Sequence, residues 1–129
     1  MKKIISTENA PSAIGPYSQA VSDGNMLFIS GQLPINPQTG SIEGENISVQ
    51  TEQALKNLKS ILKKAGMTVS NVLKTTVYLS DMENFKAMNE VYATVFTEEF
   101  PARAAFQVGR LPLDALVEIE AVASKKAGK

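Results

Sequence analysis

The sequence predicts an α+β fold in which two helices pack on one face of a mixed β-sheet. Segments of alternating apolar and polar residues predict strands, and two longer segments with helical spacing, 47–65 and 85–96, predict helices. In chain order the expected elements are β-β-β-α-β-α-β-β. A chain of 129 residues can bury one core but not two. We therefore expect a single domain over residues 1–129.

The N-terminal part of the chain is expected to form three strands. Residues 2–6 predict a short strand, and residues 19–22 and 26–30 predict two strands joined across Asp23-Gly24-Asn25, a strong hairpin signal. Residues 31–46 hold three glycines and two prolines, which predicts a long loop. Such a loop is either a binding segment or a surface excursion.

The first helix is predicted from an apolar stripe that ends just before Gly66, a residue type suited to the position after a helix. The stripe consists of Ile47, Ala54, Leu55, Leu58, Ile61, Leu62 and Ala65. Alternation returns at 72–79, where Leu73, Thr75, Val77 and Leu79 are expected to share one face of a strand.

The second helix is expected to begin at a capping box in Ser80-Asp81-Met82-Glu83 and to end before Pro101. Its inner face would carry Phe85, Met88, Tyr92, Val95 and Phe96. Two closing strands are expected at 104–110 and 117–124.

The closing strand indicates how the sheet is covered. Val117, Ile119 and Ala121 would meet the helices, which leaves Glu118 and Glu120 on the opposite face. Residues 26–29 are apolar on both faces, although two helices can cover only one face. Burial of the other face against a second subunit, and hence a homo-oligomer, is the resulting hypothesis.

The amino-acid composition limits which partners and which kinds of catalytic or metal site are expected. Lys plus Arg and Asp plus Glu number 13 each, so no excess charge favours nucleic acid or an anionic membrane. The chain has no cysteine and no histidine, which excludes disulfides, thiol nucleophiles and the commonest general base. No metal-ligand cluster or phosphate-binding loop is visible. The N-terminal apolar run is too short for a signal peptide and no stretch could span a membrane, so we expect a cytoplasmic protein.

Arg103 and Glu118 are the first candidate site residues. A guanidinium binds a carboxylate through two parallel hydrogen bonds, and a carboxylate can hold a water or a proton nearby. The alternatives are a solvated charge at a strand end, a surface salt bridge, or a structural ion pair between the two residues. Glu120, on the same face as Glu118, is better explained as a solvated residue.

Four further residues are candidates for the site, and each has an ordinary structural explanation as well. Tyr17 follows a Gly-Pro turn and could contact a ligand or simply pack half-buried. Ser30 and Gly31 end a strand where backbone N–H groups could approach a ligand, or where the chain merely turns. Asn89 lies within the second helix and is either a hydrogen-bonding residue or solvated.

Over nearly its whole length the chain resembles the RidA family, also called the YjgF/YER057c/UK114 family. The most specific part is a Pro-x-Arg, a short strand, Arg-Leu-Pro and then an aliphatic-Glu-Ile motif, at positions 101–103, 110–112 and 117–119. Other matching segments, in order, are 13–20 (AIGPYSQA), 28–32 (FISGQ), 50–51 (QT), 74–79 (KTTVYL) and 85–92 (FKAMNEVY).

The resemblance implies a chorismate-mutase-like α+β subunit that assembles as a homotrimer with ligand clefts between neighbouring subunits. It implies hydrolysis of 2-imino acids and their enamine tautomers, such as 2-iminobutanoate and 2-iminopropanoate, to 2-oxo acids and ammonia. No cofactor and no metal are expected, and the expected partners are a small-molecule substrate and further copies of the chain, not nucleic acid or membrane.

The matching positions imply roles for the candidate residues. Arg103 corresponds to the arginine that binds the substrate carboxylate, Glu118 to the carboxylate that positions water, and Tyr17 to a tyrosine near the imine. Ser30, Gly31 and Asn89 correspond to residues that line the cleft. Many relatives carry a cysteine where this chain has Ala105, so we expect any chemistry here to proceed without that thiol.

Two other functions remain open from the sequence. Some relatives are associated with endoribonuclease activity or translation inhibition, which the balanced charge and the lack of histidine disfavour. The other function is that of a non-catalytic trimer that binds a small molecule, which would need the same arginine.

Overall fold

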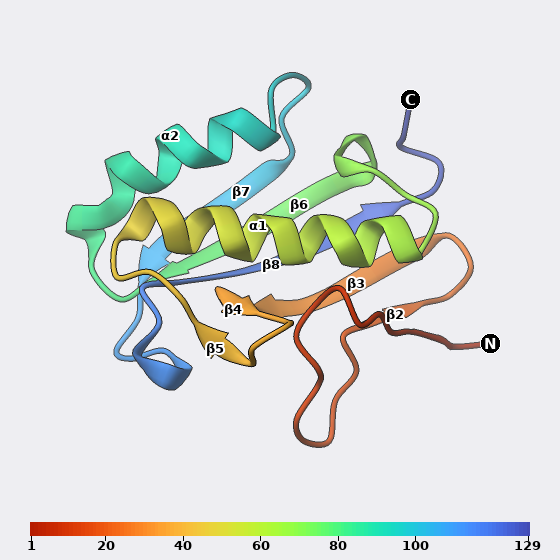
Figure 1. Ribbon diagram of the computed structural model, residues 1–129. Coiled ribbons are helices and arrows are strands. Elements are labelled where there is room, and N and C mark those ends of the chain that lie inside the picture. Colours follow the sequence, from red (N-terminus) through yellow and green to blue (C-terminus); the bar gives the residue numbers. More distant parts are fainter.

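A six-stranded β-sheet carries two helices on one face in the computed structural model, which describes residues 1–129 (Figure 1). The strands are β1 (Lys3–Ile5), β2 (Ala20–Ser22), β3 (Met26–Gln32), β6 (Val72–Leu79), β7 (Ala102–Gln107) and β8 (Val117–Ser124). Their spatial order is β1-β2-β3-β8-β6-β7, and only the β6–β7 pair is parallel. The predicted α+β class with a mixed sheet is confirmed.

The core lies between the sheet and the two helices, α1 (Ile47–Lys64) and α2 (Phe85–Val95). Leu58 and Leu62 of α1, Met88 of α2 and Ile119 of β8 are all fully buried there. Full burial of such a side chain contributes about 1.5–3 kcal/mol to stability. The predicted apolar stripes of both helices therefore face the sheet, as expected.

The helix ends follow their local sequence. Asn46 caps α1 by accepting a hydrogen bond from the Val49 N–H, at 2.9 Å, and Gly66 follows the helix with φ of +76°. The capping box expected over 80–83 was wrong. Asp81 instead caps a short 3₁₀ turn, Met82–Asn84, that leads directly into α2.

Several strand boundaries and the orientation of one side chain differ from the sequence prediction. The loop over 31–46 includes the end of β3 and a small hairpin formed by β4 (Ile35–Asn36) and β5 (Ser41–Ile42). The strand expected at 104–110 is β7, which begins and ends earlier. Leu73 is exposed, because an irregularity in the β6–β8 pairing between Val72 and Lys74 turns Val72 inward in its place.

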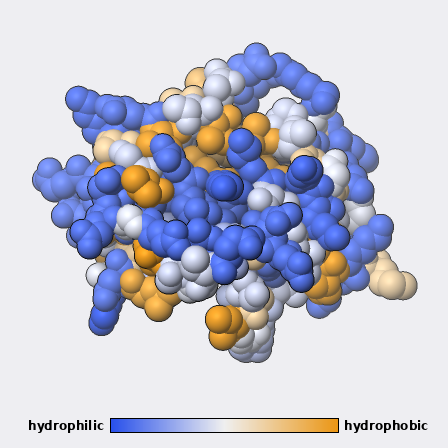
Figure 2. All heavy atoms as spheres, viewed as in Figure 1, coloured by the Kyte–Doolittle hydropathy of each residue, from blue (hydrophilic) through white to orange (hydrophobic).

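The face of the sheet opposite the helices has no cover within the chain. Its apolar and aromatic residues are Val21, Phe28, Tyr78, Phe106 and Val122, and Phe28 is 54% exposed. The helix side, in contrast, is mainly hydrophilic (Figure 2). The expected apolar residue on the uncovered face is thus present in Phe28. No helix is both long and apolar enough to cross a membrane.

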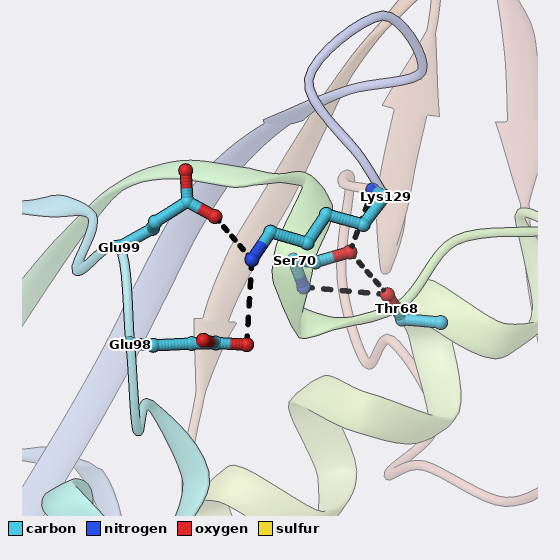
Figure 3. Close-up of polar contacts among 5 residues, drawn as sticks. All are labelled: Thr68, Ser70, Glu98, Glu99 and Lys129. Carbon is cyan, nitrogen blue, oxygen red and sulfur yellow. Dashed lines mark hydrogen bonds and ion pairs between the residues drawn. The ribbon is translucent and has the colours of Figure 1, made fainter.

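The C-terminal residue is tied to two other segments (Figure 3). The Lys129 ammonium pairs with Glu98 and Glu99 in the loop between α2 and β7, and its backbone N–H donates to Ser70 at 3.3 Å. All three charged side chains are largely exposed, so these pairs contribute little to stability.

Candidate active site

Arg103 lies on β7, the edge strand, on the face of the sheet that carries the helices. Parallel pairing places it beside Thr75 of β6, which is fully buried beneath α2. Its guanidinium extends toward α2, where Nη1 donates a hydrogen bond to Asn89 Oδ1 at 2.7 Å. The structure therefore brings together two of the sequence-predicted residues, Arg103 and Asn89.

The surroundings of Arg103 are aromatic. Its Cζ atom lies 4.8 Å from the ring centroid of Tyr92 and 5.6 Å from that of Phe85. A cavity of about 380 Å³ opens beside the guanidinium. The remaining lining residues are Asn89, Ala93, Phe96, Phe100 and Pro101. Only one guanidinium nitrogen donates to a protein acceptor, so the other N–H groups are available to a carboxylate.

Glu118 lies on the opposite face of the sheet. Its neighbours along β8, Val117 and Ile119, are fully buried under the helices, so alternation directs Glu118 to the uncovered face as predicted. The carboxylate packs against the backbone of Gly31, at an irregularity in the β3–β8 pairing. A Cβ atom on Gly31 would lie 1.9 Å from Glu118 Oε2. Glycine at position 31 is therefore what allows this approach.

The electrostatics around Glu118 make its carboxylate a stronger proton acceptor than an exposed glutamate. Burial raises the pKa of Glu118, and the charge of nearby Glu120 raises it further. Glu120 in turn accepts a hydrogen bond from the Tyr78 hydroxyl. That hydrogen bond, together with burial, raises the pKa of Tyr78 to about 12. Glu120 is thus a hydrogen-bonded residue rather than a purely solvated one.

Tyr17 and Ser30 join Glu118 and Gly31 on this part of the molecule. Tyr17 and Gly31 line the same cavity of about 240 Å³. Ser30 lies next to Gly31, and its hydroxyl donates to the backbone carbonyl of Ser18, at 2.6 Å, which is adjacent to Tyr17. Four of the predicted site residues therefore form a second group, separate from Arg103 and Asn89.

Sequence reasoning missed several residues that build the two groups. Gln19 is 4% exposed and its side chain makes hydrogen bonds to the backbone of Thr7, Ala10 and Pro11, which fixes the loop behind the Tyr17 cavity. Leu113, with φ of +58°, lines the same cavity. Tyr92 was expected only as a core residue. Of these residues, only Gln19 could have been noticed in the sequence, as a polar residue at the start of a predicted strand.

Within a single chain, the structure excludes one alternative for the first candidate pair, namely a structural ion pair. Arg103 and Glu118 form no ion pair with each other, because they lie on opposite faces of the sheet. Ala105 faces the helix side, partly buried against the core beside Val77. No group of three or more acidic residues is arranged to hold a metal ion.

The chain matches a family model described as Endoribonuclease L-PSP over residues 7–125. A RutC family protein of Pyrococcus horikoshii is 57% identical over 126 residues, which cover 98% of this chain and 100% of that protein. The Escherichia coli protein named 2-iminobutanoate/2-iminopropanoate deaminase is 46% identical over 129 residues, covering 98% of this chain and 100% of the relative.

A solved structure has the same fold as this chain. The crystal structure of E. coli TdcF with bound serine superposes with a TM-score of 0.91 at 45% sequence identity, covering 95% of this chain and 98% of the other. Both the arrangement of elements and the full-length coverage are therefore shared with this solved protein.

Proposed function

Because this chain belongs to the Endoribonuclease L-PSP family, we propose that it is a deaminase that hydrolyses 2-imino acids, such as 2-iminobutanoate and 2-iminopropanoate, to 2-oxo acids and ammonia. The observation that carries the proposal is the guanidinium of Arg103, held by Asn89 at an apolar cavity with donors left free. The name of the E. coli relative specifies the substrates, and the serine bound to TdcF is itself a small molecule with a carboxylate.

The proposed reaction begins with orientation of the substrate. Arg103 binds the carboxylate through two hydrogen bonds, which places the adjacent imine carbon toward Glu118 and Tyr17. Glu118 accepts a proton from a water molecule as the water oxygen bonds to that carbon. Glu118 passes that proton to the nitrogen, which gives a carbinolamine with a hydroxyl and an amino group on the same carbon. The hydroxyl proton then moves through Glu118 to the amino nitrogen, the carbon–nitrogen bond breaks as the carbon–oxygen double bond forms, and ammonia leaves with the 2-oxo acid.

This reaction requires a second copy of the chain. Arg103 and Glu118 lie on opposite faces of one sheet, so a single chain cannot direct both at one small substrate. We propose a chorismate-mutase-like homotrimer in which Arg103 and Asn89 of one subunit meet Tyr17, Ser30, Gly31 and Glu118 of the next. The uncovered apolar residues, Phe28 among them, supply a surface for such an assembly.

A coupled assay tests the proposed activity. Threonine dehydratase would generate 2-iminobutanoate in the presence of semicarbazide, which traps the free imine. We expect this protein to lower the trapped fraction and speed the release of 2-oxobutanoate, and we expect Arg103→Ala to behave like buffer. An unchanged trapped fraction at micromolar protein would reject the deaminase and favour a non-catalytic binder.

The family description raises endoribonuclease activity as an alternative. The equal numbers of basic and acidic residues disfavour it, since RNA binding depends on clustered positive charge. Incubation with labelled RNA over a salt series would detect it, and cleavage that survives Arg103→Ala while the imine assay stays negative would favour the ribonuclease.

A further inference from the structure

Tyr92 of α2 lies against the guanidinium of Arg103 and is itself fixed within the core. Its hydroxyl and the Thr75 hydroxyl are 2.7 Å apart in a buried hydrogen bond. We propose that Tyr92, anchored by Thr75, is a positioning residue that holds Arg103 in the orientation that receives the substrate carboxylate. This inference rests on the proposed function, because it takes a 2-imino acid as the ligand.

The first support is the contact between the ring and the cation. At 4.8 Å from the Tyr92 centroid, Arg103 Cζ lies within the distance at which an aromatic ring attracts a cation. Phe85, at 5.6 Å, lies a little farther away. A flexible arginine has many rotamers, and a ring that favours one of them reduces the ordering required when a ligand binds.

The second support is the immobility of the ring. Tyr92 is 7% exposed and Thr75 is fully buried, so their hydrogen bond is shielded from water. The ring also packs on Phe96, with centroids 4.6 Å apart. Burial raises the pKa of the Tyr92 hydroxyl above its ordinary value, so the phenol keeps its proton and stays hydrogen-bonded to Thr75. The ring is therefore a fixed support rather than a mobile side chain.

The third support is that Asn89 and Tyr92 restrain different parts of the Arg103 guanidinium. Asn89 and Tyr92 are three residues apart on α2, and thus on the same side of the helix. Asn89 accepts a hydrogen bond from Nη1, which fixes one edge of the guanidinium, while Tyr92 restrains its plane. The parallel pairing of β6 with β7 brings Thr75 and Arg103 side by side. The residue that anchors Tyr92 and the arginine that Tyr92 contacts are therefore held at fixed positions in the same sheet.

Two variants of Tyr92 separate its ring from its hydroxyl. Tyr92→Leu removes the ring, and we expect it to weaken binding of 2-oxobutanoate about tenfold and to raise KM for the imine by a similar factor, with kcat little changed. Tyr92→Phe keeps the ring and should restore most of the affinity. Met88→Val, which trims a buried side chain one turn earlier on α2, is the matched control and should keep the wild-type affinity.

A second measurement reports on the arginine without any catalysis. The sequence contains two arginines, Arg103 and Arg110, so a spectrum of arginine Nε–H groups should show two signals. The Arg110 Nε–H donates to Asp114 at 2.7 Å, so a free arginine serves as the reference instead. We expect the Arg103 signal to be displaced by the aromatic rings in the wild type, and to move toward the free-arginine position in Tyr92→Leu but not in Met88→Val.

The outcomes distinguish the inference from the proposed function. A wild-type protein without deaminase activity would reject the proposed function, while the arginine signals and 2-oxobutanoate binding would still decide the role of Tyr92. Unchanged affinity and unchanged arginine signals in Tyr92→Leu would overturn the positioning role. Equal losses in Met88→Val and Tyr92→Leu would overturn it as well, since the effect would then be general loosening of α2.

Discussion

The guanidinium of Arg103 and the carboxylate of Glu118 lie on opposite faces of the same β-sheet. Arg103 shares its face with Thr75 and the helices, whereas Glu118 packs on Gly31 on the uncovered face. Neither residue can change face without a shift in strand register. If both residues act on one substrate, as proposed, each copy of the chain would contribute two different half-sites rather than one complete site.

Mixing two inactive variants should restore activity. Arg103→Ala and Glu118→Gln are each expected to be inactive alone, because each removes one half-site from every subunit. If the sites form between copies, an equal mixture that is dissociated and reassembled should recover about a quarter of the wild-type activity, the fraction of sites with both halves intact. Recovery is measured in the imine-trapping assay. No recovery from properly reassembled oligomers would contradict shared sites.

Arg103→Lys should retain charge but lose the planar, two-point contact with a carboxylate. Loss of one charged hydrogen bond costs about 1.5–3 kcal/mol, so we expect KM to rise roughly 10- to 150-fold while the fold is unaffected. Lys86→Ala is the matched control, because it removes an exposed cation from α2 without touching the cavity. A similar rise in KM for both variants would argue against a specific role for Arg103.

The two glutamates of β8 should respond differently to neutralisation. Glu118→Gln is expected to lower kcat by about 100-fold or more, because it removes the group proposed to accept the water proton. Glu120→Gln should remain active. Since the charge of Glu120 raises the pKa of Glu118, its removal should shift the acidic limb of the rate profile to lower pH. A shift to higher pH, or none, would contradict this coupling.

Gly31→Ala should damage activity more than stability. The new Cβ would fall 1.9 Å from Glu118 Oε2, which is the end of a side chain that can swing away. We expect the carboxylate to be displaced, with kcat reduced at least tenfold, while the stability loss stays near the lower end of the roughly 1–3 kcal/mol that overpacking costs. Gly109→Ala has open space around it and serves as control. Wild-type kinetics for Gly31→Ala would show that the position of this carboxylate is unimportant.

Glu118 should also make stability depend on pH. Its pKa is raised in the folded state, so the folded protein binds a proton more readily than the unfolded chain does. Its contribution is then present at pH values below the ordinary Glu pKa of 4.5 and is lost as the pH rises through the folded-state pKa. Urea unfolding should accordingly show Glu118→Gln to be more stable than the wild type at pH 7, with the difference disappearing near pH 4. The opposite order at pH 7 would exclude this effect.

Most of the fold could be predicted because local patterns determine it. Both helices, the turn across Asp23-Gly24-Asn25 and the faces of β8 follow from periodicity and turn residues. Leu73 could not be placed, because the pairing irregularity beside it depends on register with β8 rather than on alternation. The β4–β5 hairpin was missed because its strands have two residues each and too few apolar positions to show a period.

The candidate site was predicted as a set of residues but not as an arrangement. Alternation along one strand indicates that Arg103 and Phe106 differ in face, yet only the parallel pairing with β6 shows which face is which. The family resemblance is confirmed by the match over residues 7–125, whereas the roles of Tyr17, Ser30, Gly31, Asn89, Arg103 and Glu118 stay predictions. The contact between Tyr92 and Arg103 joins a helix to an edge strand. Local sequence patterns do not predict such a contact, because it depends on how the helix packs on the sheet.

The position of β7 at the edge of the sheet has a consequence for solubility. One side of this strand pairs with β6, and its other side presents free backbone N–H and C=O groups. Such an edge is a template onto which a foreign strand can add, and from which aggregates grow. Pro101 immediately before β7 cannot donate a backbone hydrogen bond, and the strand is six residues long. Pairing along this edge is therefore confined to the six residues of β7, because it cannot continue through the nitrogen of Pro101, and this limits edge-to-edge polymerisation of the protein.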